Sequence, residues 1–274
     1  ARRFINSNRR LSMPIIEEKD FTHFLILDLC VDTQEAMGAN MINTMLEAIK
    51  RYLENRFTCE ATMAILSNLN TEALAHAYVE IPVAILKHKE ESAIKMQEAS
   101  DLAQVDPYRA ATYNKGIMNG IDAFMIASGN DWRAMEAAAH SYAARNGQYR
   151  GLSTWHYNNT KNVLEGLITL PVPIGSVGGT MHVNPKSKIT HTMLEANAKE
   201  MMEIVASLGL AQNFSALNAL VTDGIQKGHM RLHMRSLAIS VGAKPKEIDA
   251  LVTQLLKEKH QNKETAQKLL KKMR

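Results

Sequence analysis

The chain has 274 residues, of which 46% are hydrophobic and 22% are charged, and its formal net charge at pH 7 is +4. These values are typical of a soluble globular protein that can bury a sizeable core, as one large domain or two smaller ones. Aromatic residues make up only 5% of the chain, and no nucleic-acid-binding signature accompanies the mild positive charge, so we expect no nucleic-acid partner.

Three features of the sequence predict a cytoplasmic protein. Cys30 and Cys59 are its only cysteines, too few for a disulfide framework, which favours a reducing compartment. The longest uncharged run, 204–222, contains glutamine, asparagine and serine. It is therefore typical of a buried core helix and not of a membrane span. No signal peptide is visible.

The first part of the chain predicts a small α+β unit. His23–Val31 is apolar and β-branched, as in a strand, and a helical pattern follows from Glu35 to about Glu54. Gly38 and Ala39 would let an anion approach the free N–H groups of the first helical turn. A plain strand-to-helix turn explains the same residues, and no G-x-G-x-x-G motif supports a Rossmann site. Further strands are expected at 61–67 and 75–81.

The stretch DPYRAATYNKGIMNGIDAFMIASGND predicts the central helix. Asp106 can cap this helix and Pro107 can be its first residue, after a helix at 92–105. At 3.6 residues per turn, Lys115 lies on a polar stripe of a helix that is otherwise apolar. Such a lysine is either a solvated cation or a charge placed to stabilise an oxygen that becomes negative. Two nearby glycines and the acidic Asp131 beyond the helix favour the second interpretation.

The rest of the chain predicts a helix at 132–145, a hairpin within 147–169, and helices from Pro185 to the end, including 199–210, 212–223, 246–257 and 264–273. The glycine-rich loop 171–180 could wrap a phosphate or admit close backbone packing. His229 and His233 have a spacing able to bind a metal, but the H-E-x-x-H motif and a third ligand are missing, so no metal is predicted. His229 follows two glycines that could act as a hinge, and an imidazole there could donate a proton. An ordinary surface histidine is the alternative.

Several long motifs occur in one order from about His23 to the C terminus. They are EAMGANMINTMLEA, ILSN, DPYRAATYNKGIMNGIDA, GNDWRAMEAAAHSYA, GSVGGT, GLAQN and GIQKGHM. In these motifs the chain resembles class II 3-hydroxy-3-methylglutaryl-CoA reductase, the soluble bacterial type. The resemblance implies interconversion of 3-hydroxy-3-methylglutaryl-CoA with mevalonate and CoA. Two hydride transfers with NADH or NADPH would accomplish this through mevaldehyde.

The resemblance also implies roles for individual residues. Lys115 would polarise the thioester and aldehyde carbonyl oxygens, Asp131 would hydrogen-bond that lysine, and His229 would protonate the departing CoA thiolate. The residues implied to bind the substrate are Arg109, which would pair with its carboxylate, and Asn119, Gln212 and Leu220. Those implied to hold the nicotinamide nucleotide are Glu35, Met37, Gly38, Asn40 and Asn68.

The architecture implied by the resemblance is α+β. A small ferredoxin-like nucleotide-binding domain would span 1–67, a large helix-rich domain 68–222, and a mobile C-terminal helical flap 223–274. Family members form a homodimer with a shared active site, so we expect a homodimer. Two departures stand out: Glu35 replaces the usual aspartate, and the family's N-terminal ENPIGY-type segment with its catalytic glutamate has no counterpart. We therefore expect the chain to begin inside the small domain and to turn over weakly or not at all by itself.

Three alternative functions differ in class. One is a catalytically incomplete fragment that retains dimerisation and ligand binding. Another is an enzyme that acts on different CoA thioesters. The third is an anion-binding module that uses the basic C-terminal tail, 257–274. The sequence leaves open the choice between NADH and NADPH and the physiological direction of the reaction.

Overall fold

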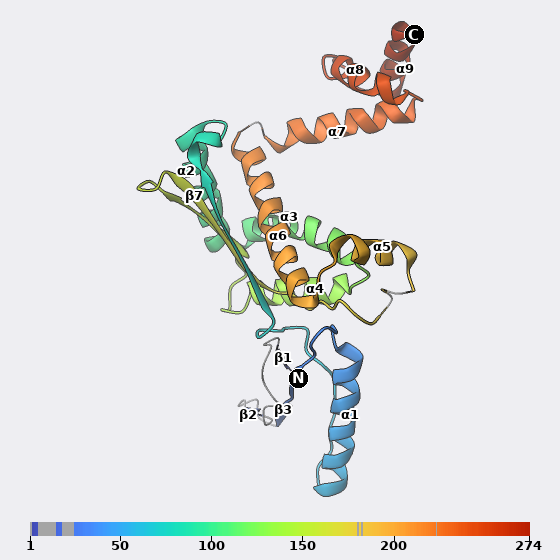
Figure 1. Ribbon diagram of the computed structural model, residues 1–274. Helices are drawn as coiled ribbons and strands as arrows, with labels where there is room; N and C mark the ends of the chain where they lie inside the picture. Colours follow the sequence, from blue (N-terminus) through green and yellow to red (C-terminus); the bar gives the residue numbers. More distant parts are fainter. Residues whose placement is uncertain (1, 5–14, 18–24, 180, 182, 223) are drawn as a thin grey trace. The chain divides into compact units, whose positions relative to one another are not determined.

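The computed structural model describes residues 2–4, 15–17, 25–179, 181, 183–222 and 224–274 (Figure 1). Side chains are described from residue 25 onward, apart from 180, 182, 223, 225–229 and 232. The chain divides into two compact units, Ala1–Phe214 and Ser215–Arg274. The structure is mixed and helix-rich with a small antiparallel sheet, which agrees with the predicted α+β class. The three-domain division stays a prediction.

Short strands form the start of the first unit. β1 (Arg2–Phe4) pairs in parallel with β4 (Cys30–Asp32), and β2 (Ile15–Glu17) pairs antiparallel with β3 (Ile26–Asp28). The single strand predicted at 23–31 is thus divided at Leu29, because its two halves bond to different partners. Its residues 23 and 24 lie outside the described part of the chain.

Helix α1 (Ala39–Arg56) confirms the helix predicted after this strand. It begins four residues later than the expected Glu35, because Gly38 at the N-cap has a φ of 86° in the left-handed region. A Cβ atom at this position would lie 2.3 Å from Cγ2 of Thr33. Glycine is therefore required here both by its conformation and by the close approach of Thr33.

The strand predicted at 61–67 is wrong, because this segment lies along α1 and pairs with no strand among the described residues. The N–H of Leu66 donates to Oδ1 of Asn43 at 3.0 Å, and the N–H of Ala61 donates to Oε1 of Glu54 at 3.1 Å. Ala64 and Leu66 also pack against the cluster of buried residues between β3–β4 and α1. Side chains of α1 thus satisfy backbone groups that a second strand would otherwise have bonded.

The main sheet has three antiparallel strands in the order β5–β7–β6 (Figure 1). They are β5 (Leu74–Pro82), β6 (Ser153–Asn158) and β7 (Val163–Pro171), which confirms the strand at 75–81 and the hairpin. Trp155 lies opposite Gly166 and is 1% exposed. Its Nε1 donates to Oδ1 of Asn213 at 2.6 Å. A Cβ atom at Gly166 would lie 2.3 Å from the indole ring, so this glycine makes room for the tryptophan.

Three helices follow β5 and the short 3-10 turn η1 (Val83–Ile85): α2 (Lys89–Val105), α3 (Pro107–Ala127) and α4 (Trp132–Ala143). α2 contacts β6, and α4 contacts β7. The predicted cap of α3 is confirmed, since Oδ1 of Asp106 accepts from the N–H of Tyr108 at 3.0 Å and Pro107 is the first helical residue. α2 and α4 thus lie against the sheet, and α3 packs against both of these helices.

Helix α5 (Pro185–Leu194) precedes α6 (Ala198–Val221), a single helix where the sequence predicted two. By length and composition alone, α6 could also cross a membrane. Its Gly209 lies against other core elements, because a Cβ atom there would lie 3.0 Å from Ile121, 3.2 Å from Ile117 and 3.3 Å from Ile168. This contact holds α6 against α3 and β7, and gives its middle the surroundings of a core helix.

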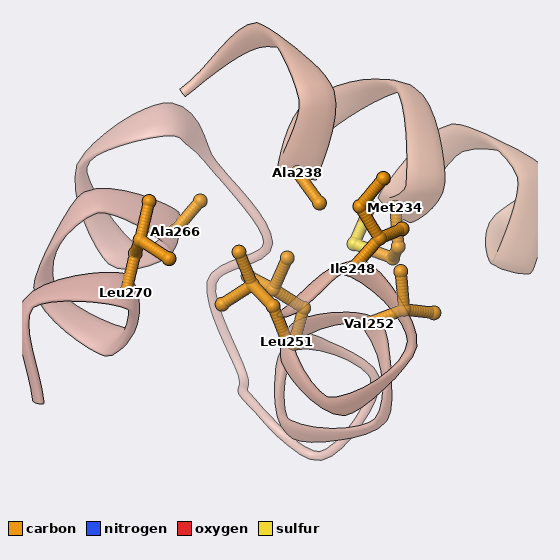
Figure 2. Packing of buried hydrophobic residues seen from close by; sticks show 8 residues of the cluster. Met234, Ala238, Ile248, Leu251, Val252, Ala266 and Leu270 are labelled. Atoms are coloured by element: carbon orange, nitrogen blue, oxygen red, sulfur yellow. The ribbon is translucent and has the colours of Figure 1, made fainter. Parts of the chain in front are cut away.

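The second unit contains α7 (Ile225–Ser240), α8 (Pro245–Leu255) and α9 (Lys263–Met273), and its last two helices confirm the helices predicted at 246–257 and 264–273. Figure 2 shows their apolar side chains pointing toward one another. The guanidinium group of Arg274 contacts the Glu247 carboxylate at 3.0 and 3.1 Å. This hydrogen bonding lowers the pKa of Glu247 to about 2, and it ties the end of α9 to the start of α8.

Candidate active site

A cleft of about 350 Å³ brings together three segments of the first unit. The segments are the loop that leads into α1, the extended stretch 65–68 and the first turn of α4. The residues lining the cleft are Met37, Ala39, Ile65, Leu66, Asn68, Asp131, Arg133 and Ala134. Met37 and Asn68, predicted to hold a nucleotide, thus share a cleft with Asp131, predicted to be catalytic.

The loop that leads into α1 is joined to the glycine-rich loop. The carbonyl oxygen of Glu35 accepts from the N–H groups of Ser176 at 2.8 Å and Val177 at 3.3 Å, and Ala36 forms a parallel bridge with Val177. A Cβ atom at Gly175 would lie 2.5 Å from the backbone nitrogen of Met37. The sequence left two interpretations of the glycine-rich loop, a turn that wraps a phosphate and close backbone packing. Close backbone packing explains Gly175.

Three other predicted nucleotide-binding residues lie on or near this loop. The Glu35 carboxylate accepts hydrogen bonds from the Ser176 hydroxyl and from the N–H of Ala198, the latter at 2.8 Å. Gly38 caps α1 without a side-chain hydrogen bond, and Asn40 is exposed in its first turn. The N-cap residue of α1 thus provides no side-chain cap, and uncapped N–H groups in the first turn of a helix can bind an anion.

Lys115 lies on the exposed face of α3, on the same face as Asn119. Within the described residues, no hydrogen-bond or ion-pair partner of its ammonium group is found. Asp131 is the N-cap of α4: its Oδ1 accepts from the N–H groups of Arg133 at 3.0 Å and Ala134 at 3.1 Å. It also lies 3.6 Å from Nε of Arg133.

The predicted hydrogen bond between Lys115 and Asp131 is not formed among the described residues of this chain. Twelve residues of α3 separate Lys115 from the helix end at Ala127, and at 1.5 Å per residue they span about 18 Å. Asp131 follows that end as the cap of the next helix. The sequence pattern placed both groups near the same helix but could not show this separation.

The predicted substrate-binding residues lie in both units. Arg109 is half-buried near the start of α3, with its guanidinium carbon 5.9 Å from the centre of the Tyr113 ring. Gln212 of α6 is next to α3, because a Cβ atom at Gly120 would lie 3.2 Å from its Oε1. Arg109, Asn119 and Gln212 therefore belong to the first unit, whereas Leu220 belongs to the second.

His229 lies in α7 of the second unit, and its side chain is outside the described part of the chain. Its proton-donor role therefore stays a prediction. Among the described residues no group of three or more His, Cys, Asp or Glu side chains could hold a metal ion. The expectation that the protein uses no metal also stays a prediction.

Sequence analysis missed a cluster of titratable side chains between α3 and α4. The carboxyl groups of Asp122 and Glu136 are close enough to raise the pKa of Asp122, because two neighbouring carboxyl groups disfavour two negative charges. Oδ1 of Asp122 is buried without a described hydrogen-bond partner. Oε2 of Glu136 lies 2.5 Å from Nε2 of His140, whose Nδ1 lies 2.6 Å from the Tyr149 hydroxyl. Helical spacing had placed Asp122 on the Lys115 stripe, but no local pattern links it to Glu136.

Burial, together with the neighbouring Glu136 carboxyl group, raises the pKa of Asp122 from 3.8 to about 7. Between about pH 4 and pH 7, the Asp122 carboxyl group therefore carries a proton in the folded protein but has lost it in the unfolded chain. The contribution of Asp122 to stability is largest below this range and is lost as the pH rises to about 7.

An Asp122→Asn variant should therefore be more stable than the unchanged protein, and increasingly so as the pH rises from 4.5 to 8. The neutral amide of asparagine can donate to Glu136 without taking up a proton. Because Asp122 is partly exposed, we expect the free energy of unfolding to increase by only about 1 kcal/mol at pH 8. Urea unfolding at both pH values measures the gain. Asp101→Asn, on the exposed surface of α2, is the matched control. An equal effect of Asp122→Asn at both pH values would contradict the prediction.

The comparisons with known proteins agree on one family. The family model for hydroxymethylglutaryl-coenzyme A reductase matches residues 6–234. The chain is similar to 3-hydroxy-3-methylglutaryl-coenzyme A reductase of Archaeoglobus fulgidus, with 43% identity over 251 residues, or 91% of this chain and 57% of that protein. It is also similar to the probable reductase of Borreliella burgdorferi, with 38% identity over 234 residues, or 84% of this chain and 53% of that protein.

Solved structures are similar as well. The class II 3-hydroxy-3-methylglutaryl-CoA reductase of Streptococcus pneumoniae, described as bound to NADPH in open conformations, matches with a TM-score of 0.75 and 47% identity. The match covers 96% of this chain and 65% of that one. A second structure of the S. pneumoniae reductase has a TM-score of 0.68 and 49% identity, covering 89% and 59%. The chain thus spans between about half and two thirds of the length of these proteins.

Proposed function

Since the chain belongs to the hydroxymethylglutaryl-coenzyme A reductase family, we propose that it supplies most of the active site of such an enzyme. The reaction is the interconversion of 3-hydroxy-3-methylglutaryl-CoA with mevalonate and CoA, in a soluble cytoplasmic protein. The observation that carries the proposal is the cleft shared by Met37, Asn68 and Asp131. It joins residues implied to hold the nucleotide to one implied in catalysis.

A nicotinamide nucleotide fits the groups around this cleft. Its volume of about 350 Å³ is at the lower end for small-molecule sites. The N-terminal N–H groups of α1, without a side-chain cap, suit a phosphate group, and Asn68 offers an amide. NADH or NADPH bound there would supply the hydride in each reduction step.

Three residues of the chain carry out the remaining steps of the proposed reaction. Lys115 donates to the carbonyl oxygen and stabilises the negative charge that develops on it, an effect worth about 3 kcal/mol in a site that excludes water. Arg109 holds the substrate carboxylate with its planar guanidinium group. His229 gives a proton to the CoA thiolate, which makes the thiol the leaving group.

The protein acts as a homodimer, with Lys115 of one copy close to Asp131 of the other. The absence of this contact among the described residues of one chain supports the arrangement. The exposed face of α3 also carries large side chains without a described partner, since Tyr108 is 89% exposed and Ile126 is 59% exposed. Exposed apolar groups of this kind are typical of a surface that a second copy covers.

The second candidate is a catalytically incomplete form that keeps dimerisation and ligand binding. The observation favouring it is that the chain spans only 57% of the A. fulgidus reductase and 53% of the B. burgdorferi one. In this case the residues described above bind CoA and nucleotide, but a group needed for turnover is supplied by another segment.

Mevalonate-dependent reduction tests the function directly. The chain, and a version extended with the N-terminal segment of a relative, are incubated with mevalonate and CoA, and the absorbance of NADH or NADPH is followed separately for NAD and NADP. We expect turnover by the extended protein, and weak or no turnover by the chain alone together with binding of NADH or NADPH. If the extended protein neither turns over nor binds either nucleotide, the proposal is wrong.

A further inference from the structure

The Glu35 side chain is hydrogen-bonded to other groups of the protein through its carboxylate oxygen Oε2. Its carboxylate accepts hydrogen bonds from the hydroxyl of Ser176, 141 residues away, and from the N–H of Ala198, 163 residues away. Its carbonyl oxygen accepts from the N–H groups of Ser176 and Val177. A single residue thus bonds to two distant segments of the first unit, through both its side chain and its backbone.

The negative charge of Glu35 is suited to the second of these segments. Ala198 is the first residue of α6, and the N–H groups at a helix N terminus carry a partial positive charge and lack partners inside the helix. The adjacent Asn197 and Glu200 already satisfy each other's backbone N–H groups, at 2.8 and 2.9 Å. The Glu35 carboxylate accepts from a further backbone N–H group at the start of α6, that of Ala198.

Besides Glu35 itself, the same loop carries two further residues implied to hold the nucleotide. Met37, two residues after Glu35, lines the cleft, and its backbone nitrogen lies close to Gly175. Gly38 is then the N-cap of α1. A displacement of Glu35 would therefore move Met37 and the first turn of α1 relative to Asn68 and Asp131.

We propose that Glu35 is a positioning residue: its carboxylate fastens the loop 33–38 to Ser176 and to the start of α6, and so sets the shape of the nucleotide site without contacting the nucleotide. This inference rests on the proposed function, because it assumes that NADH or NADPH binds in the cleft. The resemblance implies no role for Ser176. According to the proposal, its hydroxyl group matters as much for the affinity of the nucleotide as the Glu35 carboxylate does.

Nucleotide binding by four proteins tests the inference: the unchanged chain, Glu35→Ala, Ser176→Ala and the double variant. The dissociation constants of NADPH and NADH are measured by fluorescence titration. We expect each single variant to weaken binding by about 10-fold, the loss of roughly one hydrogen bond. The double variant should be no weaker than Glu35→Ala, because Ser176 acts only through its hydrogen bond to Glu35.

Two further variants separate position from contact and from stability. Glu35→Gln has the same length and can still accept from Ala198, so it should restore most of the affinity that Glu35→Ala loses. Glu47→Ala, an exposed change on α1, is the control and should bind as the unchanged chain does. Thermal unfolding of every variant shows whether it is folded at the titration temperature.

The possible results lead to distinct conclusions. If Ser176→Ala binds NADPH and NADH normally while Glu35→Ala does not, Glu35 contacts the nucleotide itself and the inference is overturned. Multiplied losses in the double variant overturn it too, and in both cases the proposed function stands. If the unchanged chain binds neither nucleotide, the inference fails, and binding and turnover by the extended protein then decide whether the proposed function fails with it.

Discussion

A Lys115→Ala variant of the N-terminally extended protein is expected to lose hydride transfer, with kcat reduced by at least about 100- to 1000-fold. The ammonium group is the cation that would meet the carbonyl oxygen as it becomes negative, and alanine offers nothing in its place. Stopped-flow or steady-state oxidation of NADPH with 3-hydroxy-3-methylglutaryl-CoA measures the loss. An unchanged rate would remove Lys115 from the mechanism.

The fold should tolerate this change. Lys115 is exposed on α3 and has no partner among the described residues, and alanine favours helices more than lysine does. The free energy of unfolding should therefore change by less than about 0.5 kcal/mol. Lys95→Ala is the matched control, an exposed helical lysine of α2 that lies 2.6 Å from Glu91. It should keep full activity. Lys115→Arg keeps the charge but not the compact ammonium group, and should not restore the rate.

Asp131→Asn should separate the two tasks of Asp131. As the N-cap of α4, its Oδ1 accepts from two backbone N–H groups, and an asparagine oxygen can do the same with similar stability. The negative charge, which we propose interacts with Lys115, is lost. We expect kcat to fall by about 100- to 1000-fold while the free energy of unfolding stays nearly unchanged.

Two further variants show whether the lost activity comes from the lost negative charge or from the lost helix cap. Asp131→Ala removes both the cap and the charge, and should lower the free energy of unfolding by about 1 kcal/mol in addition. Asp106→Asn makes the same change at the N-cap of α3 and should leave the rate unaffected. If Asp131→Asn has normal activity, the aspartate serves only as a helix cap.

Mixing the two inactive variants tests whether the site is shared. In a dimer of one Lys115→Ala copy and one Asp131→Asn copy, one active site would have both defects and the other would have neither. Free exchange of subunits should then restore about a quarter of the normal activity, because half of the dimers are mixed and each has one intact site. If each site is built within one copy, mixing restores nothing, and the proposed arrangement of the dimer is wrong.

Local patterns predicted those elements whose stability depends on neighbours in the sequence. The Asp106–Pro107 start of α3 was predicted because a helix cap involves residues two or three positions apart. The 61–67 strand failed for the opposite reason: a strand requires partners elsewhere in the chain, and here the side chains of Asn43 and Glu54 satisfied its backbone instead. The break predicted within α6 also failed, because packing against α3 and β7 supports one continuous helix.

The sequence by itself determined the family, through motifs in a fixed order, and it placed Lys115 on a polar stripe of α3. Only the tertiary structure brought Met37, Asn68 and Asp131 into one cleft, bonded Glu35 to Ser176 and Ala198, and set Asp122 against Glu136. The physical reason is the range of the interactions. Helical periodicity and capping act within about four residues, whereas these contacts join residues from 14 to 163 positions apart and form only when the elements pack.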